Sequence, residues 1–363
     1  MTLDACDSCM RRTWLLARLS GHLDVKRGRV WQLLGLADND LINAVGGQSA
    51  AAIQVELATF HARQASLARR HAEQLGLELL CACGELYPSR LRELERPPAV
   101  LHIAGGLDRL VRFCEQDSVA LVGARKASAY GTGVARSLGR GLGTAGITVI
   151  SGMAAGIDSA AHHGALDAQA ATIAVLPGPA NSPYPPGNAG LYRKIVGRGV
   201  AIGEIAPDTP VRSWMFPARN RLIAALGSAT VVVQAAERSG SLLTVRASAE
   251  LDRPIGAVPG QVTSRLSAGP NRLLAEGAPV IRDAQDVLDL LYGVGTRSVV
   301  ADARSRPTSD QSAVLTAVAE GIDTVADLVA AGVAGGQCLQ HVAALELSGH
   351  LRRGPGGILS VIS

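Results

Sequence analysis

The stretch Val119-Ala-Leu-Val-Gly123-Ala-Arg125-Lys-Ala-Ser128-Ala-Tyr130-Gly131 decides the fold class of this chain. An apolar run ends in a glycine turn, and the residues that follow are typical of a helix start. A buried strand that enters a helix through a glycine turn is the first half of a βαβ unit. We therefore expect a parallel strand here, with backbone N–H groups and Arg125 at its carboxyl end.

Further short apolar runs repeat this pattern along the chain. Stretches long enough for crossover helices separate them, as in a parallel sheet. The sequence predicts an α/β protein with a Rossmann-like, doubly wound, mostly parallel sheet. The predicted strands after the first are residues 147–151, 172–177, 229–233 and 255–259, and a β-prone run at residues 97–103 opens the core.

Composition and hydrophobic pattern divide the chain into four parts. Residues 1–76 predict a helical N-terminal domain, and residues 77–292 the Rossmann-like core. Residues 293–309 are rich in Gly, Ser, Arg and Asp, which predicts a linker. Residues 310–363 carry helical patterns followed by a glycine-turned hairpin, which predicts a winged-helix domain.

Composition and charge restrict the partners only loosely. The net charge of +4 and the pI of about 8.8 fit a polyanionic partner but do not require one. The sequence has no uninterrupted apolar stretch of membrane-spanning length and does not begin like a signal sequence. We expect a cytoplasmic protein that makes no membrane contact.

Six cysteines are too few for a disulfide scaffold in so long a chain. Cys6-x-x-Cys9 and Cys81-x-Cys83 could together supply four metal ligands, although the second spacing is less usual. Buried or idle thiols in a reducing cytosol are the simpler interpretation. We expect no metal and no cofactor.

Four further segments place polar groups at predicted strand ends or beside them. Backbone amides, hydroxyls and cations in such places suit phosphates, and aromatic rings suit bases. An acid/base pair of Asp158 and His162 is an alternative in the first segment, where capping by Asp158 is the simpler reading. The segments are Ser151-Gly152-Met-Ala-Ala-Gly156-Ile-Asp158-Ser-Ala-Ala-His162, Pro183-Tyr184 to Ile195, Phe216-Pro-Ala-Arg219-Asn220-Arg221-Leu-Ile223 and Arg238-Ser239-Gly240-Ser241-Leu-Leu-Thr244.

Taken in order, these motifs resemble the core of the DNA-processing protein A (DprA/Smf) family, over roughly residues 87–291. Ala124 and Gln234 depart from the family pattern, which commonly has serine and glutamate there. The resemblance implies that Arg125 contacts the DNA backbone and that a basic residue, here Lys194, lies beside a bound nucleotide. The DNA-binding residues that we predict are Gly123, Arg125, Ser128, Tyr130, Gly131, Ser151, Gly152, Gly156, Lys194, Arg219, Asn220, Arg221, Ser239, Gly240 and Ser241.

The family's activities imply a function that is not enzymatic. They predict that the protein binds and protects single-stranded DNA and loads the RecA recombinase in natural transformation or homologous recombination. The expected partners are single-stranded DNA, RecA and a second copy of this chain in a homodimer.

Two alternatives remain open from the sequence. The first is a nucleotide-binding protein or nucleotide phosphoribohydrolase of the related lysine-decarboxylase-like group. If Thr244 is aligned with that group's threonine, Ala247 takes the place of the required carboxylate. The second is duplex binding by the winged helix through Arg352 and Arg353.

Overall fold

The computed structural model describes residues 5–298 and 307–361. The chain divides into two compact units, Met1–Val299 and Val300–Ser363. We describe each unit by itself.

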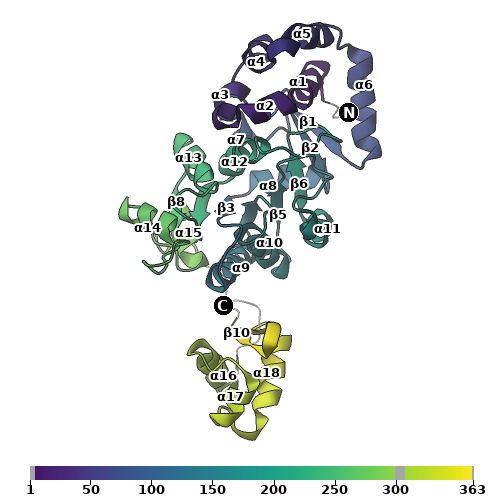
Figure 1. Ribbon diagram of the computed structural model, residues 1–363. Coiled ribbons are helices and arrows are strands. Elements are labelled where there is room, and N and C mark those ends of the chain that lie inside the picture. Colours follow the sequence, from purple (N-terminus) through teal and green to yellow (C-terminus); the bar gives the residue numbers. More distant parts are fainter. Residues whose placement is uncertain (1–4, 299–306, 362–363) are drawn as a thin grey trace. The chain divides into compact units, whose positions relative to one another are not determined.

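The first unit is built on a mixed sheet (Figure 1). Within residues 5–298 this sheet has eight strands in the order β1-β2-β6-β5-β4-β3-β7-β8. From β6 to β8 the neighbours are parallel, whereas β2 is antiparallel to both β1 and β6. The strands are β1 (Glu78–Cys81), β2 (Val100–Ala104), β3 (Ser118–Val122), β4 (Thr148–Ser151), β5 (Thr172–Val175), β6 (Val200–Gly203), β7 (Ala229–Val232) and β8 (Ile255–Ala257).

Helices cover both faces of this sheet. Val119 and Leu121 point to one face and pack with α9, α10 and α15, whereas Ala120 and Val122 pack on the other face with α8, α12 and α13. This alternation is that of a strand buried on both sides. The core helices are α7 (Ser89–Arg92), α8 (Leu107–Glu115), α9 (Ala129–Thr144), α10 (Ile157–Asp167), η3 (Pro186–Asn188), α11 (Ala189–Arg198), α12 (Met215–Leu226), α13 (Leu242–Glu250), α14 (Ala268–Ala275) and α15 (Ala284–Tyr292).

The N-terminal helices pack against the start of α12. Trp214 is fully buried among them; its backbone N–H donates to Asp24 and its indole N–H to the carbonyl of Ser20. The indole N–H of Trp31 donates to the carbonyl of Pro217, at 2.7 Å. These helices therefore hold the segment that leads into α12. They are α1 (Asp7–Arg18), α2 (Ser20–Val25), η1 (Arg27–Arg29), α3 (Val30–Leu34), α4 (Asp38–Val45), η2 (Gly47–Ser49), α5 (Ala50–Ala58) and α6 (Ala62–Gln74).

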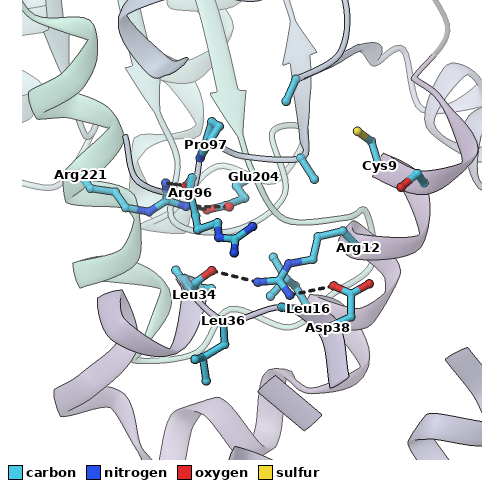
Figure 2. Close-up of a pocket in the computed structure, with 14 residues that line it drawn as sticks. Cys9, Arg12, Leu16, Leu34, Leu36, Asp38, Arg96, Pro97, Glu204 and Arg221 are labelled. Atoms are coloured by element: carbon cyan, nitrogen blue, oxygen red, sulfur yellow. Dashed lines mark hydrogen bonds and ion pairs between the residues drawn. The ribbon is translucent and has the colours of Figure 1, made fainter. Parts of the chain in front are cut away.

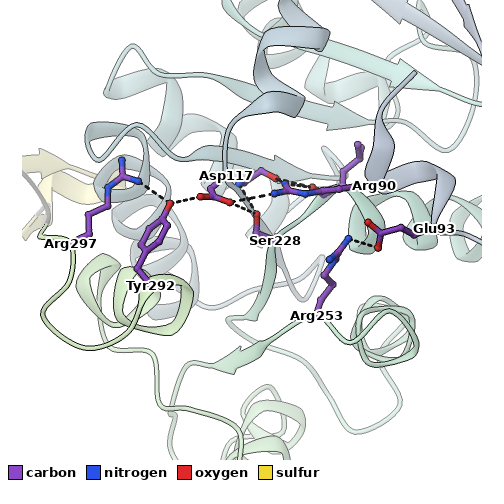
Figure 3. A network of polar contacts seen from close by, with 9 residues as sticks. Arg90, Glu93, Asp117, Ser228, Arg253, Tyr292 and Arg297 are labelled. Carbon is purple, nitrogen blue, oxygen red and sulfur yellow. Dashed lines mark hydrogen bonds and ion pairs between the residues drawn. The ribbon is translucent and has the colours of Figure 1, made fainter. Parts of the chain in front are cut away.

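A polar network ties the end of the core to the amino end of β3 (Figure 3). Asp117 accepts from the hydroxyls of Tyr292 and Ser228, at 2.7 and 3.0 Å, and pairs with Arg90. Arg297 donates to the Tyr292 hydroxyl at 2.8 Å. Residues 293–298 of the predicted linker thus lie against the core, and residues 299–306 of it lie outside the described residues.

The second unit has a small core of its own, formed by Val314, Leu328, Val342, Leu351 and Leu359 among others. Three helices precede a two-stranded antiparallel ribbon, the element order expected of a winged helix. The exposed Arg353 forms a two-point ion pair with Glu346. The elements are α16 (Ser309–Ala319), α17 (Val325–Ala330), η4 (Gly335–Gln337), α18 (Cys338–Leu347), β9 (Leu351–Arg353), η5 (Pro355–Gly357) and β10 (Leu359–Val361).

The predicted α/β class and the mostly parallel sheet are confirmed. The sequence analysis missed the two short strands β1 and β6, each of four residues. β1 begins with the exposed Glu78 and β6 has three apolar residues before a glycine, so neither forms the longer apolar run by which the other strands were found. No helix of the described ranges is both long and apolar enough to cross a bilayer.

Candidate nucleic-acid interface

A pocket of about 370 Å³ opens where β3, β4 and β7 end. From β3 the chain continues to β4 on one side, whereas β7 lies on the other side of β3. Such a reversal of strand order is where open α/β sheets bind ligands. Of the predicted residues, the pocket brings together Gly123, Arg125, Arg219, Asn220, Ser239, Gly240 and Ser241.

Arg125 and two aromatic rings form the exposed part of this site. The Arg125 guanidinium lies over the Phe216 ring, 4.6 Å from its centroid. Tyr184 meets the same ring edge to face, with centroids 5.2 Å apart. Arg125 is exposed and both rings are half-buried. One cation and two rings from three separate segments therefore share one surface.

The turn after β3 is held by Gln234, which follows β7. The Gln234 side chain accepts from the backbone N–H of Ser128 and donates to its hydroxyl, at 3.0 and 2.8 Å. Ser128 also caps α9 by accepting from the N–H of Gly131. A Cβ on Gly131 would lie 2.2 Å from the Gln234 side chain, so a larger residue there would displace Gln234 from Ser128. Tyr130 donates to the carbonyl of Pro259.

The buried carboxylate of Asp158 accepts a hydrogen bond from a backbone N–H of the loop after β4. Asp158 is buried and accepts from the N–H of Ala154 at 3.4 Å, a bond to the loop before α10. Burial raises the pKa of Asp158, and the positive charge of Arg219 opposes that rise. Ser151 donates its hydroxyl to the carbonyl of Leu121. The predicted phosphate cradle is thus already filled in part by this protein's own carboxylate.

Two further residues fix the shape of that loop. Met153 has φ 54°, an unusual value for a residue with a side chain, and its carbonyl accepts from Asn188 at 2.8 Å. Gly156 has φ 81°, and a Cβ there would lie 2.3 Å from the carbonyl of Ala124. Asn188 therefore joins the segment before α11 to this loop.

Asp158 and His162 do not form an acid/base pair. The Nδ1 atom of His162 lies 2.7 Å from the hydroxyl of Thr172, which itself donates to Val149. Burial lowers the pKa of His162 to about 3, and the charge of nearby His163 adds to this effect. His162 is a neutral core residue at neutral pH.

The structure differs from the expected phosphate clamp at Arg219. Residues 219–221 lie within α12 rather than before it, and the side chain of Arg219 is buried. Its Nη1 donates to the carbonyls of Gly152 and Val175, at 2.7 and 2.6 Å. Burial lowers its pKa to about 10, against the attraction of Asp158. A Cβ on Gly152 would lie 2.0 Å from this guanidinium.

Arg221 is also turned inward. Its Nη2 bonds both carboxylate oxygens of Glu204, at 2.7 and 2.6 Å, and its Nη1 donates to the carbonyl of Arg96 (Figure 2). Both side chains of the pair are about 9% exposed. This pair lines a different pocket, between α1, the segment after α3 and the core.

The remaining predicted residues lie in the pocket or outside it. Within the pocket, Asn220 donates to the carbonyl of Gly240, and the hydroxyls of Ser239 and Ser241 are 2.7 Å apart. Lys194 is exposed on α11 and is not among the residues that line the pocket. The sequence analysis quoted Phe216 and Tyr184 within motifs but did not place them in the site. Their meeting depends on tertiary packing that spacing does not show.

The fold and this pocket define a Rossmann-like protein with a polar and aromatic site at the switch point of its sheet. Residues 78–292 match the model of the family described as DNA recombination-mediator protein A, and the chain belongs to that family.

The matched relatives differ in how much of this chain they cover. Protein Smf of Escherichia coli is 34% identical over 295 residues, which are 78% of each chain. The putative DNA processing protein DprA of Mycobacterium tuberculosis is 43% identical over 178 residues, 49% of this chain. That match spans only 46% of the M. tuberculosis protein.

Two solved structures share the fold. The X-ray structure of DNA processing protein A from Streptococcus pneumoniae is 28% identical, with a TM-score of 0.61, and the match covers 77% of this chain and 96% of that one. The protein from Helicobacter pylori is 27% identical, with a TM-score of 0.53, over 60% of this chain and 97% of that one. The latter structure concerns that protein's binding of single-stranded DNA.

Proposed function

We propose that this protein binds single-stranded DNA along the carboxyl edge of β3, β4 and β7. The observation that carries the proposal is the stack of Arg125, Phe216 and Tyr184 beside the pocket. Aromatic faces receive unstacked bases of any sequence, and a guanidinium pairs with phosphate. Duplex DNA keeps its bases stacked and offers no base face to these rings.

The cations of the site support a backbone-directed interaction. Arg125, Lys126 and Arg238 are exposed on loops that follow β3 and β7, and Lys194 is exposed on α11. Arg219 acts by holding the loop after β4, because its guanidinium donates to the carbonyls of Gly152 and Val175. Arg221 pairs with Glu204 in the other pocket and does not face the proposed site. Phosphate contacts and stacking carry little base information, so sequence preference is slight.

The proposal includes no catalytic step. Among the described residues that line the pocket, Asp158 is the one carboxylate, and it is buried against amides of its own loop. Ala247 stands where the phosphoribohydrolase alternative needs a carboxylate, and it is buried in α13. Release of free base from a nucleoside monophosphate by the purified protein would establish the enzymatic alternative.

The family relationship supports a recombination role in the cytoplasm for the bound strand. We propose that the protein protects incoming single strands and loads RecA onto them in natural transformation or homologous recombination, and that it acts as a homodimer. The test is RecA filament assembly on single strands coated with this protein. Faster assembly than on the same strands without the protein is expected, and no acceleration would contradict loading. Light scattering of the purified chain tests for the dimer mass.

The C-terminal unit is proposed to be a winged helix that is dispensable for single-strand binding. Arg353 of the β9–β10 ribbon is already paired with Glu346, so Arg352 is the arginine of this ribbon whose side chain has no ion pair within the described residues. Removal of residues 310–363 is expected to leave single-strand affinity within about twofold, because one surface cation contributes little. Loss of all DNA binding would move the site to this unit.

The direct test of strand preference is a competition experiment. The full chain is titrated into fluorescently labelled oligothymidine, and the anisotropy is followed as unlabelled single strand or duplex is added. Single strands should displace the label at concentrations at least tenfold below those of the matching duplex. Equal competition by duplex would contradict the stacking geometry.

A further inference from the structure

Four cysteines from two distant segments meet in the first unit. The Sγ atoms of Cys6, Cys9, Cys81 and Cys83 all lie within 4.8 Å of one another. Cys9 and Cys83 are 74 positions apart in the sequence, yet their sulfurs are 3.7 Å apart. A disulfide needs an S–S distance of about 2.05 Å, and the structure has these cysteines as free thiols.

The spacing of the sulfurs matches a tetrahedral thiolate site. Zinc bonds each cysteine sulfur at about 2.3 Å, so the sulfurs of a regular tetrahedron lie about 3.8 Å apart. The Cys9–Cys83 distance is already that of such an edge. The sequence analysis favoured idle thiols because Cys81-x-Cys83 is a less usual spacing. Convergence of both pairs removes that reason.

The backbone holds each cysteine pair in a closed local structure. Cys6 precedes α1 and its carbonyl accepts from the N–H of Met10, which places Cys9 in the first turn of the helix. Cys81 ends β1, and the N–H of Gly84 donates to its carbonyl at 2.8 Å, closing a turn around Cys83. Both pairs are therefore presented by fixed backbone, as structural metal sites require.

Arginines lie against both cysteine-bearing segments. Arg92 donates to the carbonyls of Ala82 and Gly84, each at 2.5 Å, on either side of Cys83. Arg69 donates to the carbonyl of Ala5, next to Cys6, at 2.7 Å. These cations suit a site whose four thiolates and one divalent ion carry a net negative charge.

We propose that Cys6, Cys9, Cys81 and Cys83 bind one zinc ion in a structural site. Four thiolates fill a tetrahedral shell and leave no position for a water or substrate, so the site has no catalytic role. On binding, each thiol releases its proton to solvent and no electron is transferred. Zinc is the metal most often held by four cysteines outside redox centres.

The site joins the N-terminal helices to the edge of the sheet. Cys9 and Cys81 belong to one apolar cluster with Met10 and Leu79, so the metal lies between the start of α1 and the end of β1. Cys9 also lines the pocket that holds the Arg221–Glu204 pair (Figure 2). Trp214, at the start of α12, donates hydrogen bonds to Asp24 and to the carbonyl of Ser20 in these N-terminal helices. The zinc site thus helps to fix the N-terminal helices that hold the start of α12, where Phe216 lies. The proposal of a zinc site does not depend on the proposal of DNA binding.

The first experiment is metal analysis of the full chain purified without chelators. We expect about one zinc per chain, and cobalt exchanged into the site should give the visible absorption of a tetrahedral cobalt thiolate. Cys83→Ser removes the exposed ligand with the least disturbance to packing and should lower zinc content at least tenfold, with an unchanged far-ultraviolet spectrum. Cys114→Ser, in α8, is the matched control and should keep the metal.

Three results would overturn the proposal. If the purified protein held no metal and its four thiols reacted with a thiol reagent before unfolding, the cluster would not be a metal site. A mass lower by two hydrogens with a Cys9–Cys83 linkage would show a disulfide in its place. Iron in the wild-type chain, removed by Cys83→Ser, would contradict the assignment of zinc.

Discussion

The guanidinium of Arg125 lies 4.6 Å from the centroid of the Phe216 ring, which joins the loop after β3 to the first turn of α12. A cation over an aromatic face at an exposed site contributes about 0.5–1 kcal/mol. The pair therefore holds the Arg125 side chain over the ring while its outer N–H groups stay open to solvent. In the proposed function, Arg125 supplies the phosphate contact and Phe216 the base contact.

Phe216→Leu is expected to weaken binding of oligothymidine roughly five- to 150-fold. Leucine keeps apolar bulk but removes the ring face, and stacking of one base on an aromatic side chain contributes about 1–3 kcal/mol. Phe60→Leu is the matched control, because Phe60 pairs with Trp14 among the N-terminal helices. Anisotropy titrations measure both. Equal affinities for the two variants would mean that Phe216 stacks no base.

Arg221→Met is expected to lower the free energy of unfolding by about 3–5 kcal/mol, since it leaves the Glu204 carboxylate buried without its partner. Adding Glu204→Gln should recover part of that loss, because the two residues form one pair. Urea unfolding followed by tryptophan fluorescence reports on the first unit, which contains all three tryptophans.

The Arg221 variants also separate positioning from DNA contact. Folded Arg221→Met protein should bind single strands nearly as wild type does, because Nη1 and Nη2 of Arg221 face Arg96 and Glu204. A variant of full stability that has lost DNA binding would show instead that Arg221 touches the strand.

Acid should destabilise the first unit from about pH 6.5 downward. Burial lowers the pKa of His162 to about 3 and that of His102 to about 4, so between these values and 6.5 only the unfolded chain takes up the protons. Stability therefore falls as pH falls, by up to about 1.4 kcal/mol per pH unit for each group. His162→Leu should flatten this slope in urea titrations between pH 7 and about pH 5. An unchanged slope would mean that His162 is protonated in the folded state.

The sheet was predictable from the sequence because its central strands are apolar runs that end in glycine or polar turns. Three of these strands, at residues 118–122, 148–151 and 229–232, are buried on both faces. A strand buried on both faces has apolar residues at nearly every position and so appears in the sequence as an apolar run. The predicted strand ends placed Gly123, Arg125 and Ser239 at one edge of the sheet, and all three line the same pocket.

The inward turn of Arg219 and Arg221 could not be predicted in this way. A motif shows that cations are close in sequence but not whether they face solvent, and on α12 both are buried beside carbonyls or Glu204. The same holds for the cysteines, whose two pairs meet where the start of α1 lies beside the end of β1. Contacts between distant segments depend on packing, which spacing in a single sequence does not encode.

The most direct test of single-strand binding at this edge is the salt dependence of oligothymidine affinity for wild type, Arg125→Ala and Arg272→Ala. Arg272, exposed on α14 and paired with Glu276, is the matched control. We predict steep salt dependence for wild type and Arg272→Ala, and weaker binding for Arg125→Ala with a slope lower by about 0.7, the loss of one phosphate contact. Identical affinity and slope for all three proteins would contradict the placement of the site at Arg125.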